Sequence, residues 1–393
     1  MPRESTNFRD ETLALPIGSQ RSLFDIPSGV AYFNTAYNAP LLNASRTRLV
    51  SAVSAKSHPW ERTSPDFFAD AERMRQLAAS LFGGDVDGYS LIPAASYGLS
   101  AAARAIEPTL RPGDRIVLLA DEFPSNVYPW RRTANETGAV VTTVPTPVNG
   151  DWTAATLEVL ASGARVASLG GAHWTNGARV DLSAIGDACR AAGITLVLDM
   201  TQSLGAMPFD MTAVQPDFCV AAGYKWLLCP YGIGLMYVGP AWRNARPLEE
   251  SWLTRSNAAD FTSLANYSDD YMPGARRFDV GEKCTASLPG AVAALEQVQE
   301  WGVARVAASL ADINGRIQTR LESLGFELPP PGARCPHMFG ARVPAHWTGD
   351  VVGALRAQQV FVSQRASSIR FAPHLHVTEA DIDQLFAALA TLS

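Results

Sequence analysis

Cysteine and histidine are scarce in this chain of 393 residues, and neither is arranged as a metal site would need. The five cysteines are scattered and form no Cys-x-x-Cys pair. This pattern argues against a disulfide framework or a cysteine-rich zinc site and predicts reduced thiols. Among the six histidines, only His374 and His376 lie close together in sequence. Their spacing is not typical of metal ligands, so we predict no metal site.

Long apolar runs and a strong charge of either sign are also missing. No run reaches the roughly 18 apolar residues of a transmembrane helix. Residues 1–20 are polar and lack the apolar core of a signal peptide, so we expect a cytoplasmic protein that does not bind membranes. The net charge of −6 comes from 32 basic and 38 acidic residues. With no basic tract, nothing indicates nucleic acid as a partner.

What the sequence does contain is a set of short apolar runs separated by helical patterns. Several runs lack polar alternation, which is typical of strands buried on both faces. Strands alternating with helices predict an α/β fold, here with a mostly parallel seven-stranded sheet. The last two runs are too close for a crossover helix, so at least one strand should be antiparallel. The predicted strands are residues 89–92, 115–119, 139–144, 166–169, 194–198, 218–222 and 234–238.

The length suits two domains, and the pattern of elements changes along the chain. We predict an N-terminal arm and active-site loop over 1–40, a large α/β domain over 41–271 and a small α+β C-terminal domain over 272–393. The final helix should begin after Thr378, which opens a capping-box pattern. Residues 31–40 read equally as a strand and turn or as a loop bringing Tyr37 and Asn38 to a substrate.

Two charged residues stand at the ends of neighbouring predicted strands within 194–234. One apolar run ends at Asp199, and the next ends just before Lys225. Ligands of such sheets bind at the carboxyl ends of the strands. Buried charges there are costly unless a ligand uses both. We predict that the ligand is pyridoxal phosphate (PLP), with Lys225 as its Schiff-base lysine and Asp199 paired with its pyridine nitrogen.

Both residue types suit that chemistry. Desolvation lowers the pKa of a lysine and favours the neutral amine that Schiff-base formation requires. An ionised carboxylate holds the pyridine nitrogen protonated, so that the ring can act as an electron sink. The simpler alternatives are a surface lysine before a hairpin for Lys225 and a helix N-cap for Asp199.

Further residues are candidates for holding the cofactor. Ala95 and Ser96 open a predicted helix, where backbone N–H groups and a hydroxyl can bind phosphate. Tyr224 can add a phosphate contact, Phe123 can stack on the ring, and Gln202 can donate to the ring's O3′ oxygen. An N-cap, a polar turn and core packing are the alternatives for these positions.

Arg370 is the candidate for binding a substrate carboxylate. It lies alone in an apolar strand, where an unpaired guanidinium is costly, and its planar fork matches a carboxylate. A structural salt bridge is the alternative. Other candidate pocket residues, for which core packing explains the pattern equally well, are Tyr37, Asn38, His173, Trp174, Trp252 and Cys284.

Taken together, these motifs resemble the class V aminotransferase family of fold-type I PLP enzymes. That family includes cysteine desulfurases, kynureninases, isopenicillin N epimerases, aminotransferases and C–S lyases. The resemblance covers nearly the whole chain and is most specific at 198–205 and 223–226. It implies a homodimer with the active site at the subunit interface and a small amino-acid substrate. It also implies the roles given above to Lys225, Asp199 and Arg370.

Within the family, the details point in different directions. Residues 122–125, Glu-Phe-Pro-Ser, and Tyr224 look like kynureninase. Cysteine desulfurases carry a nucleophilic cysteine before the carboxylate-binding arginine, but residues 362–368 contain none. The family's Gly-Thr phosphate donor from the neighbouring subunit is replaced by Gly281-Glu282. Thr285 is the nearest threonine that could take its place.

The leading prediction is therefore an enzyme acting on a small L-amino acid. Lys225 would remove the proton at Cα, and a bond at Cβ would break, as in a C–S lyase or a kynureninase-like hydrolase. An aminotransferase, an amino-acid epimerase and a PLP-binding protein without turnover remain the alternatives.

Overall fold

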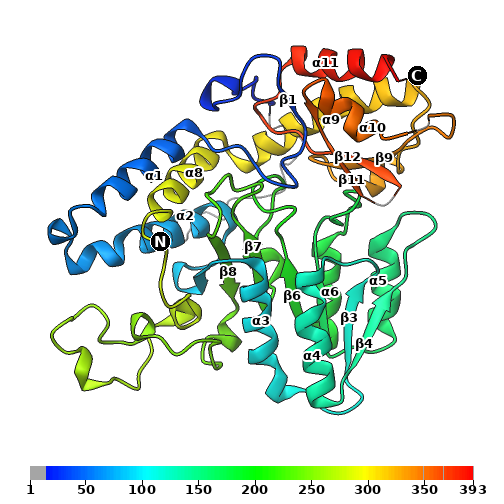
Figure 1. Cartoon of the computed structure of the whole chain (residues 1–393). Coiled ribbons are helices and arrows are strands. Elements are labelled where there is room, and N and C mark those ends of the chain that lie inside the picture. The colour runs from blue at the N-terminus through cyan, green and yellow to red at the C-terminus, as the bar shows by residue number, and fades with distance from the viewer. Residues whose placement is uncertain (1–14, 348, 366, 393) are drawn as a thin grey trace, which may run out of the picture.

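A seven-stranded sheet lies at the centre of the larger part of the chain (Figure 1). The computed structural model describes residues 15–347, 349–365 and 367–392. The strand order is β2-β8-β7-β6-β5-β3-β4, and β8 is antiparallel to both of its neighbours. The predicted sheet and its antiparallel strand are confirmed. The strands are β2 (Tyr89–Ile92), β3 (Arg115–Leu119), β4 (Val140–Val144), β5 (Val166–Leu169), β6 (Thr195–Asp199), β7 (Phe218–Ala222) and β8 (Gly234–Val238).

Helices cover both faces of this sheet, which explains the unbroken apolar runs. In β7, Phe218 and Val220 pack into the core beneath α3 (Ala95–Ile106) and α4 (Tyr128–Thr137). The alternate residues of β7 belong to the opposite core, together with residues of α5 (Trp152–Ala161) and α6 (Leu182–Ala192). Because both faces are buried, period-two polar alternation is absent from β7.

Three helices from distant parts of the chain lie side by side next to the sheet (Figure 1). They are α1 (Asn43–Ala55), α2 (Ala69–Phe82) and α8 (Leu288–Trp301). The short helix α7 (Met211–Val214) precedes β7.

The C-terminal part builds a smaller unit around a three-stranded antiparallel sheet of order β11-β12-β9. The short strand β1 pairs in parallel with β10, so residues near the N-terminus join this unit. The domain boundaries stay a prediction, and residues 1–14 of the predicted arm lie outside the described residues. The elements are β1 (Ala31–Tyr32), α9 (Val303–Ser323), β9 (Phe339–Arg342), α10 (Val351–Ala357), β10 (Val360–Phe361), β11 (Ser363–Arg365), β12 (Ser368–Phe371) and α11 (Glu379–Ala390).

Two local predictions for this unit can be compared with the structure. Thr378 caps α11, its hydroxyl and backbone both bonding with Asp381, as the capping-box pattern predicts. Residues 31–32 form a strand followed by a turn, which is one of the two interpretations left open for that region.

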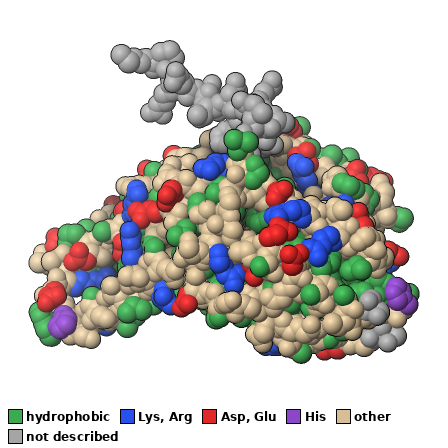
Figure 2. Space-filling view, turned by 90° about the horizontal axis from the view of Figure 1, so that it is seen from above, with side chains coloured by type: hydrophobic (Ala, Val, Ile, Leu, Met, Phe, Trp, Pro, Cys, Tyr) green, Lys and Arg blue, Asp and Glu red, His purple; other side chains and the backbone are tan. Residues whose placement is uncertain are grey.

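Charged side chains of both signs are interspersed on the face seen from above (Figure 2). Arg320 of α9 pairs with Asp383 of α11 at 2.8 Å, and Arg316 pairs with Glu379. Among the described residues, no helix combines the length and apolar character needed to cross a membrane.

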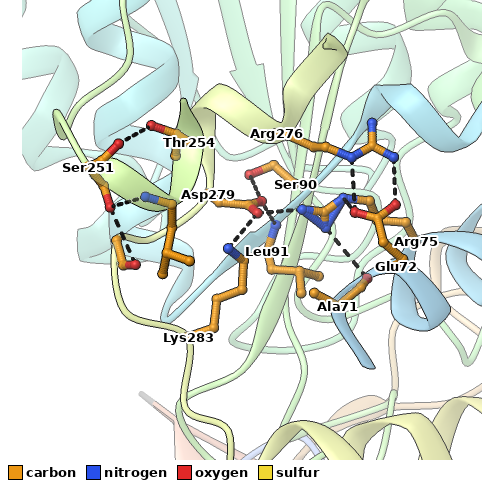
Figure 3. Close-up of polar contacts among 12 residues, drawn as sticks. Ala71, Glu72, Arg75, Ser90, Leu91, Ser251, Thr254, Arg276, Asp279 and Lys283 are labelled. Atoms are coloured by element: carbon orange, nitrogen blue, oxygen red, sulfur yellow. Dashed lines mark hydrogen bonds and ion pairs between the residues drawn. The ribbon is translucent and has the colours of Figure 1, made fainter. Parts of the chain in front are cut away.

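A buried ion cluster fixes the chain just after the turn Gly274–Phe278 against the large sheet (Figure 3). The carboxylate of Asp279 accepts the backbone N–H of Leu91 at 2.8 Å and pairs with Lys283 at 2.9 Å and with Arg75 of α2. Burial opposes ionisation of Asp279, but the charges of Arg75 and Lys283 outweigh it and lower its pKa. The folded protein therefore keeps Asp279 ionised.

Candidate active site

A cavity of about 230 Å³ opens at the carboxyl ends of the central strands. It lies where β2, β6 and β7 end, which is where α/β sheets bind ligands. Most of the residues predicted to hold a cofactor meet in this cavity. Those in its wall are Ala95, Ser96, Phe123, Trp174, Asp199, Gln202, Tyr224 and Lys225.

Lys225 is 6% exposed and follows β7 in a tight loop. The loop needs glycine at 223, because a Cβ there would lie 2.6 Å from the carbonyl oxygen of Ile233. Among the described residues, Nζ of Lys225 has no hydrogen-bond or ion-pair partner. It lies 5.7 Å from the ring centroid of Phe123 and 5.6 Å from that of Tyr224. An amine without a partner in a cavity wall is free to react.

The surroundings of Lys225 favour its neutral form. Burial lowers its pKa to about 8, and the charges of Arg370 and Arg365 act in the same direction, while Asp199 opposes them. A substantial fraction of the amine is then unprotonated near neutral pH, which is the form that attacks an aldehyde.

Asp199 is the last residue of β6 and lines the same cavity. Its Oδ1 accepts the backbone N–H of Thr201 at 3.0 Å, and Thr201 Oγ1 accepts the N–H of Ala222 at 3.1 Å. Burial raises the pKa of Asp199, opposed by the hydrogen bonds from Thr201 and by the charge of Lys225. A protonated ring nitrogen next to Asp199 would favour its ionised form.

Helix α3 begins at the cavity rim and has no side-chain cap. The first N–H groups of a helix have no acceptor within the helix and carry the positive end of its dipole. At Ala95 and Ser96 these groups face a cavity that also holds a lysine and a carboxylate. This arrangement is suited to a phosphate.

Aromatic rings form one side of the cavity. The rings of Phe123 and Trp174 meet edge to face with centroids 5.3 Å apart, and Trp174 Nε1 donates to the carbonyl oxygen of Asp121 at 2.7 Å. Phe123 is 37% exposed, so it lines the opening rather than filling a core. On another side, the rings of Tyr224 and Tyr231 lie 4.4 Å apart.

Gln202 reaches the cavity, but both ends of its amide are engaged with other groups. Its Nε2 donates to the carbonyl oxygen of Ala36 at 3.0 Å, and its Oε1 accepts from Trp226 Nε1 at 3.0 Å. Only the second N–H of Nε2 is left to meet a ring oxygen. The proposed contact with O3′ therefore stays a prediction.

Arg370 lies behind Trp174 in β12 and is 1% exposed. Its Nη1 donates to the carbonyl oxygen of Trp174 at 2.6 Å. Nε and Nη2 of Arg370 are buried and have no partner in the described part of the chain. Burial, followed by the charge of Arg365, lowers the pKa of Arg370 to about 9. No acidic side chain of the described residues forms the salt bridge considered as its alternative role.

Several candidates from the sequence lie elsewhere. His173 is 4% exposed, its ring stacks on Trp152 at 4.9 Å, and Nε2 and Nδ1 contact Ala120 and Thr175. It therefore supports the loop before Trp174. The candidates that line a wider groove of about 960 Å³ are Trp252, Cys284 and Thr285.

Tyr37 and Asn38 lie outside the cavity wall as far as the described residues define it. Tyr37 is 61% exposed. Its charge nevertheless contributes to raising the pKa of Tyr224, after burial and the effects of Tyr231 and Asp199. The backbone N–H of Ala39, two residues on, donates to the carbonyl oxygen of Tyr224 at 3.0 Å, so this segment lies beside a residue of the cavity wall.

Two functional candidates escaped the sequence reasoning. Glu122 lines the cavity; its Oε1 accepts the N–H of Phe123 at 2.8 Å, whereas its buried Oε2 has no partner among the described residues. Burial, with the charge of Asp199 adding to it, raises the pKa of Glu122 to about 7. The second is Arg365, whose guanidinium carbon lies 5.8 Å from the ring centroid of Trp174. A carboxylate just past a strand end was the signal for Glu122.

The residues of this cavity fit PLP. They provide an unpaired lysine amine for its aldehyde and a carboxyl with a raised pKa for its ring nitrogen. They also provide a free helix N-terminus for its phosphate and an aromatic wall for its ring. Among the described residues, no three His, Cys, Asp or Glu side chains gather as metal ligands would.

Comparison with known proteins gives the same cofactor. The family model described as Aminotransferase class-V matches residues 51–385. An uncharacterised aminotransferase, C777.03c of Schizosaccharomyces pombe, is 23% identical over 93% of this chain and 92% of that protein. Kynureninase of Deinococcus radiodurans is 28% identical over 72% of this chain and 68% of that enzyme. A structure of a C-DES mutant with glycine covalently linked to its PLP cofactor has a TM-score of 0.86 and 20% identity. The superposition covers 95% of this chain and 99% of the C-DES chain.

Proposed function

The chain belongs to the aminotransferase class-V family and is a PLP-dependent enzyme, and on this premise we propose that it cleaves a bond at Cβ of a small L-amino acid. The observation that carries the proposal is Lys225. This buried amine has a pKa of about 8, no partner, and a place in the cavity wall together with Asp199 and Glu122.

When bound, PLP supplies an electron sink for negative charge that develops at Cα. Lys225 would hold the cofactor through its amine and would accept the proton from Cα of the substrate. Its lowered pKa suits this task, because a base works best when its pKa lies near the working pH. Asp199 keeps the ring nitrogen protonated by its negative charge.

The remaining residues position the reactants. Arg370 binds the substrate α-carboxylate through Nε and Nη2, which are otherwise unsatisfied. Phe123 and Trp174 confine the ring and exclude water from one side of the cavity. The first N–H groups of α3 hold the phosphate.

Glu122 favours cleavage at Cβ over simple proton return to Cα. A departing group at Cβ needs a proton donor, and a carboxyl with a pKa of about 7 can hold a proton near neutral pH. Similarity to kynureninase of Deinococcus radiodurans and to the fold of a cystine C–S lyase supports the same reaction class. Residues 362–368 contain no cysteine that could take sulfur as a persulfide.

A panel of L-amino acids that includes S-substituted cysteines tests the reaction. Elimination at Cβ predicts a 2-oxo acid and ammonia, and hydrolytic cleavage of the kynureninase kind predicts L-alanine, in both cases without any added acceptor. A 2-oxo acid that forms only with an amino acceptor would instead mean transamination, and loss of optical rotation alone would mean epimerisation. Lys225→Ala should abolish turnover. The matched control, Lys56→Ala, changes a lysine of the wider groove and should retain it.

The proposal includes a homodimer. Thr285 lies in the wider groove and not in the wall of the 230 Å³ cavity, so it would serve the partner's phosphate rather than its own. Sedimentation should give a particle of twice the chain mass. Mixing Lys225→Ala with Thr285→Ala chains should then restore activity to one site per hybrid dimer. A monomer with full activity would refute the shared site.

A further inference from the structure

The hairpin β11–β12 carries several polar groups on one face. In its antiparallel register, Ser363 lies opposite Arg370 and Arg365 lies opposite Ser368. Opposed residues share a face of a sheet, and so do alternate residues along a strand. Ser363, Arg365 and Arg370 therefore project on the same side.

This face of the hairpin carries more unsatisfied hydrogen-bond donors than a single bound carboxylate could accept from. Buried atoms without a hydrogen-bond partner in the described chain include Oγ of Ser363, Nε of Arg365, and Nε and Nη2 of Arg370. Neither arginine forms an ion pair with a described acidic side chain. Buried donors are normally satisfied, so such a cluster indicates a missing ligand. A carboxylate bound to Arg370 in the bidentate way satisfies that guanidinium and leaves Nε of Arg365 unsatisfied. The Nη1 of Arg365 donates to the carbonyl oxygen of Gln364 at 2.7 Å.

The face is turned toward Trp174, which lines the cavity. Arg370 donates to the carbonyl oxygen of Trp174 at 2.6 Å, and the Arg365 guanidinium lies 5.8 Å from the Trp174 ring centroid. Gly340, opposite Arg370 on β9, packs tightly on Asn176, because a Cβ at position 340 would lie 3.0 Å from Cβ of Asn176. The sheet is thus packed closely on the loop that supplies the cavity's Trp174. The charges of both arginines also reach Lys225 and lower its pKa.

A third arginine on the same face, Arg342, has a structural role and serves as a comparison for Arg365. Arg342 lies opposite Ser368 on β9, and its side chain is 63% exposed and pairs with Glu327 at 3.2 Å. Arg365 has no such partner and lies nearer the cavity. The contrast shows that no acidic side chain of the described residues balances the charge of Arg365.

We propose that Arg365 forms a second anion subsite beside Arg370, and that the substrate is an L-amino acid whose side chain carries a carboxylate, a sulfinate or a similar anion. The assignment of Arg370 to the α-carboxylate, on which this inference rests, belongs to the proposed function. The planar guanidinium of Arg365, stacked toward Trp174, suits such an oxyanion. The two subsites would bind the two ends of one small substrate and fix its orientation above Lys225.

An isosteric substrate pair tests the subsite in the holoenzyme. S-Carboxymethyl-L-cysteine and S-carbamoylmethyl-L-cysteine both carry a leaving group at Cβ, and they differ in side-chain charge but hardly in size. We expect kcat/KM to favour the charged member by about 10- to 100-fold, the usual worth of a charged hydrogen bond. Arg365→Gln should remove that preference mainly through the KM of the charged member. Arg342→Gln, the matched control on the same face, should keep it.

A binding measurement separates this subsite from the proposed reaction. Calorimetry with unreactive glutarate and butyrate requires no turnover. The wild type should bind glutarate about 10- to 100-fold more tightly than butyrate, whereas Arg365→Gln should bind the two ligands about equally. If glutarate shows this pattern while no amino acid is cleaved, the subsite stands and the reaction fails. If Arg365→Gln weakens charged and neutral ligands equally, or if the wild type has no preference, the subsite is refuted. An unchanged melting temperature and cofactor absorbance would show that the variant is folded.

Discussion

The guanidinium of Arg370 donates to the carbonyl oxygen of Trp174 across 2.6 Å. This bond joins β12, near the end of the chain, to a loop that follows β5 of the large sheet. Nε and Nη2 of the same arginine are buried and have no hydrogen-bond partner among the described residues. The bond therefore ties the candidate for binding the substrate carboxylate to the loop of Trp174, 196 positions away in sequence.

Arg370→Lys should separate substrate binding from cofactor binding. Lysine keeps the charge but loses the planar fork and the bidentate contact. We expect kcat/KM for amino acids to fall roughly 10²-fold, with the visible absorbance of the bound cofactor unchanged. Steady-state kinetics and an absorption spectrum check the two parts. Loss of the cofactor in this variant would instead place Arg370 in the phosphate or ring site.

The pH dependence of cofactor capture reports the pKa of Lys225. In protein freed of PLP, the rate of covalent capture should rise with pH and level off above about 8, because only the neutral amine reacts. Arg370→Gln removes a positive charge and should move the midpoint to higher pH. Asp199→Asn removes a negative charge and should move it lower. A midpoint near the ordinary lysine value of about 10.4 would contradict the described burial.

Glu122 should make the stability of the cofactor-free protein depend on pH. Its pKa is raised from 4.5 to about 7, so the folded state keeps a proton that the unfolded chain loses between these values. Unfolding free energy should therefore fall as pH rises from about 4.5 to about 7. Urea titrations across this range should show a smaller fall in Glu122→Gln. Part of it should remain, because burial also raises the pKa of Asp199.

An identical slope in Glu122→Gln and the wild type would show that Glu122 ionises as it does in water. Asp66→Asn serves as the control, since Asp66 is solvent-exposed and its pKa is lowered by its hydrogen bonds to Thr63. Its removal should leave the slope between pH 4.5 and 7 unchanged.

Asp279→Asn tests the ion cluster of Figure 3. The variant keeps the shape of the side chain but leaves the buried charges of Arg75 and Lys283 without their carboxylate. We expect a loss of about 3–5 kcal/mol in unfolding free energy. Because the pKa of Asp279 is lowered in the folded state, the wild type should lose the same stabilisation only in strong acid, below its ordinary value of 3.8. Chemical denaturation of both proteins at neutral pH measures the difference, and a change below about 1 kcal/mol would contradict it.

The central sheet could be predicted because strands buried on both faces appear in the sequence as unbroken apolar runs. In β7, every residue from Phe218 to Ala222 is buried and apolar. Asp199 and Lys225 then stand out, because a charge interrupts such a run only at its end. Because ligands bind at the carboxyl ends of the strands in such sheets, the sequence alone predicts that both residues face one cavity.

The rest of the site depends on contacts that the sequence does not display. β11 was missed because Ser363–Arg365 is short and polar, and the position of Arg365 follows only from its pairing with β12. Gln202 contacts Ala36, 166 positions away. The orientation of His173 depends on stacking with Trp152. Distant packing of this kind has no local pattern.

The absorption spectrum of the purified protein with PLP tests the central claim most directly. We predict a yellow protein whose visible absorbance requires Lys225, survives in Lys56→Ala, and is absent in Lys225→Ala at equal cofactor concentration. Borohydride reduction should then fix the cofactor to Lys225, as peptide mass spectrometry would show. A wild-type protein that PLP cannot colour, or a cofactor fixed to another lysine, would contradict it.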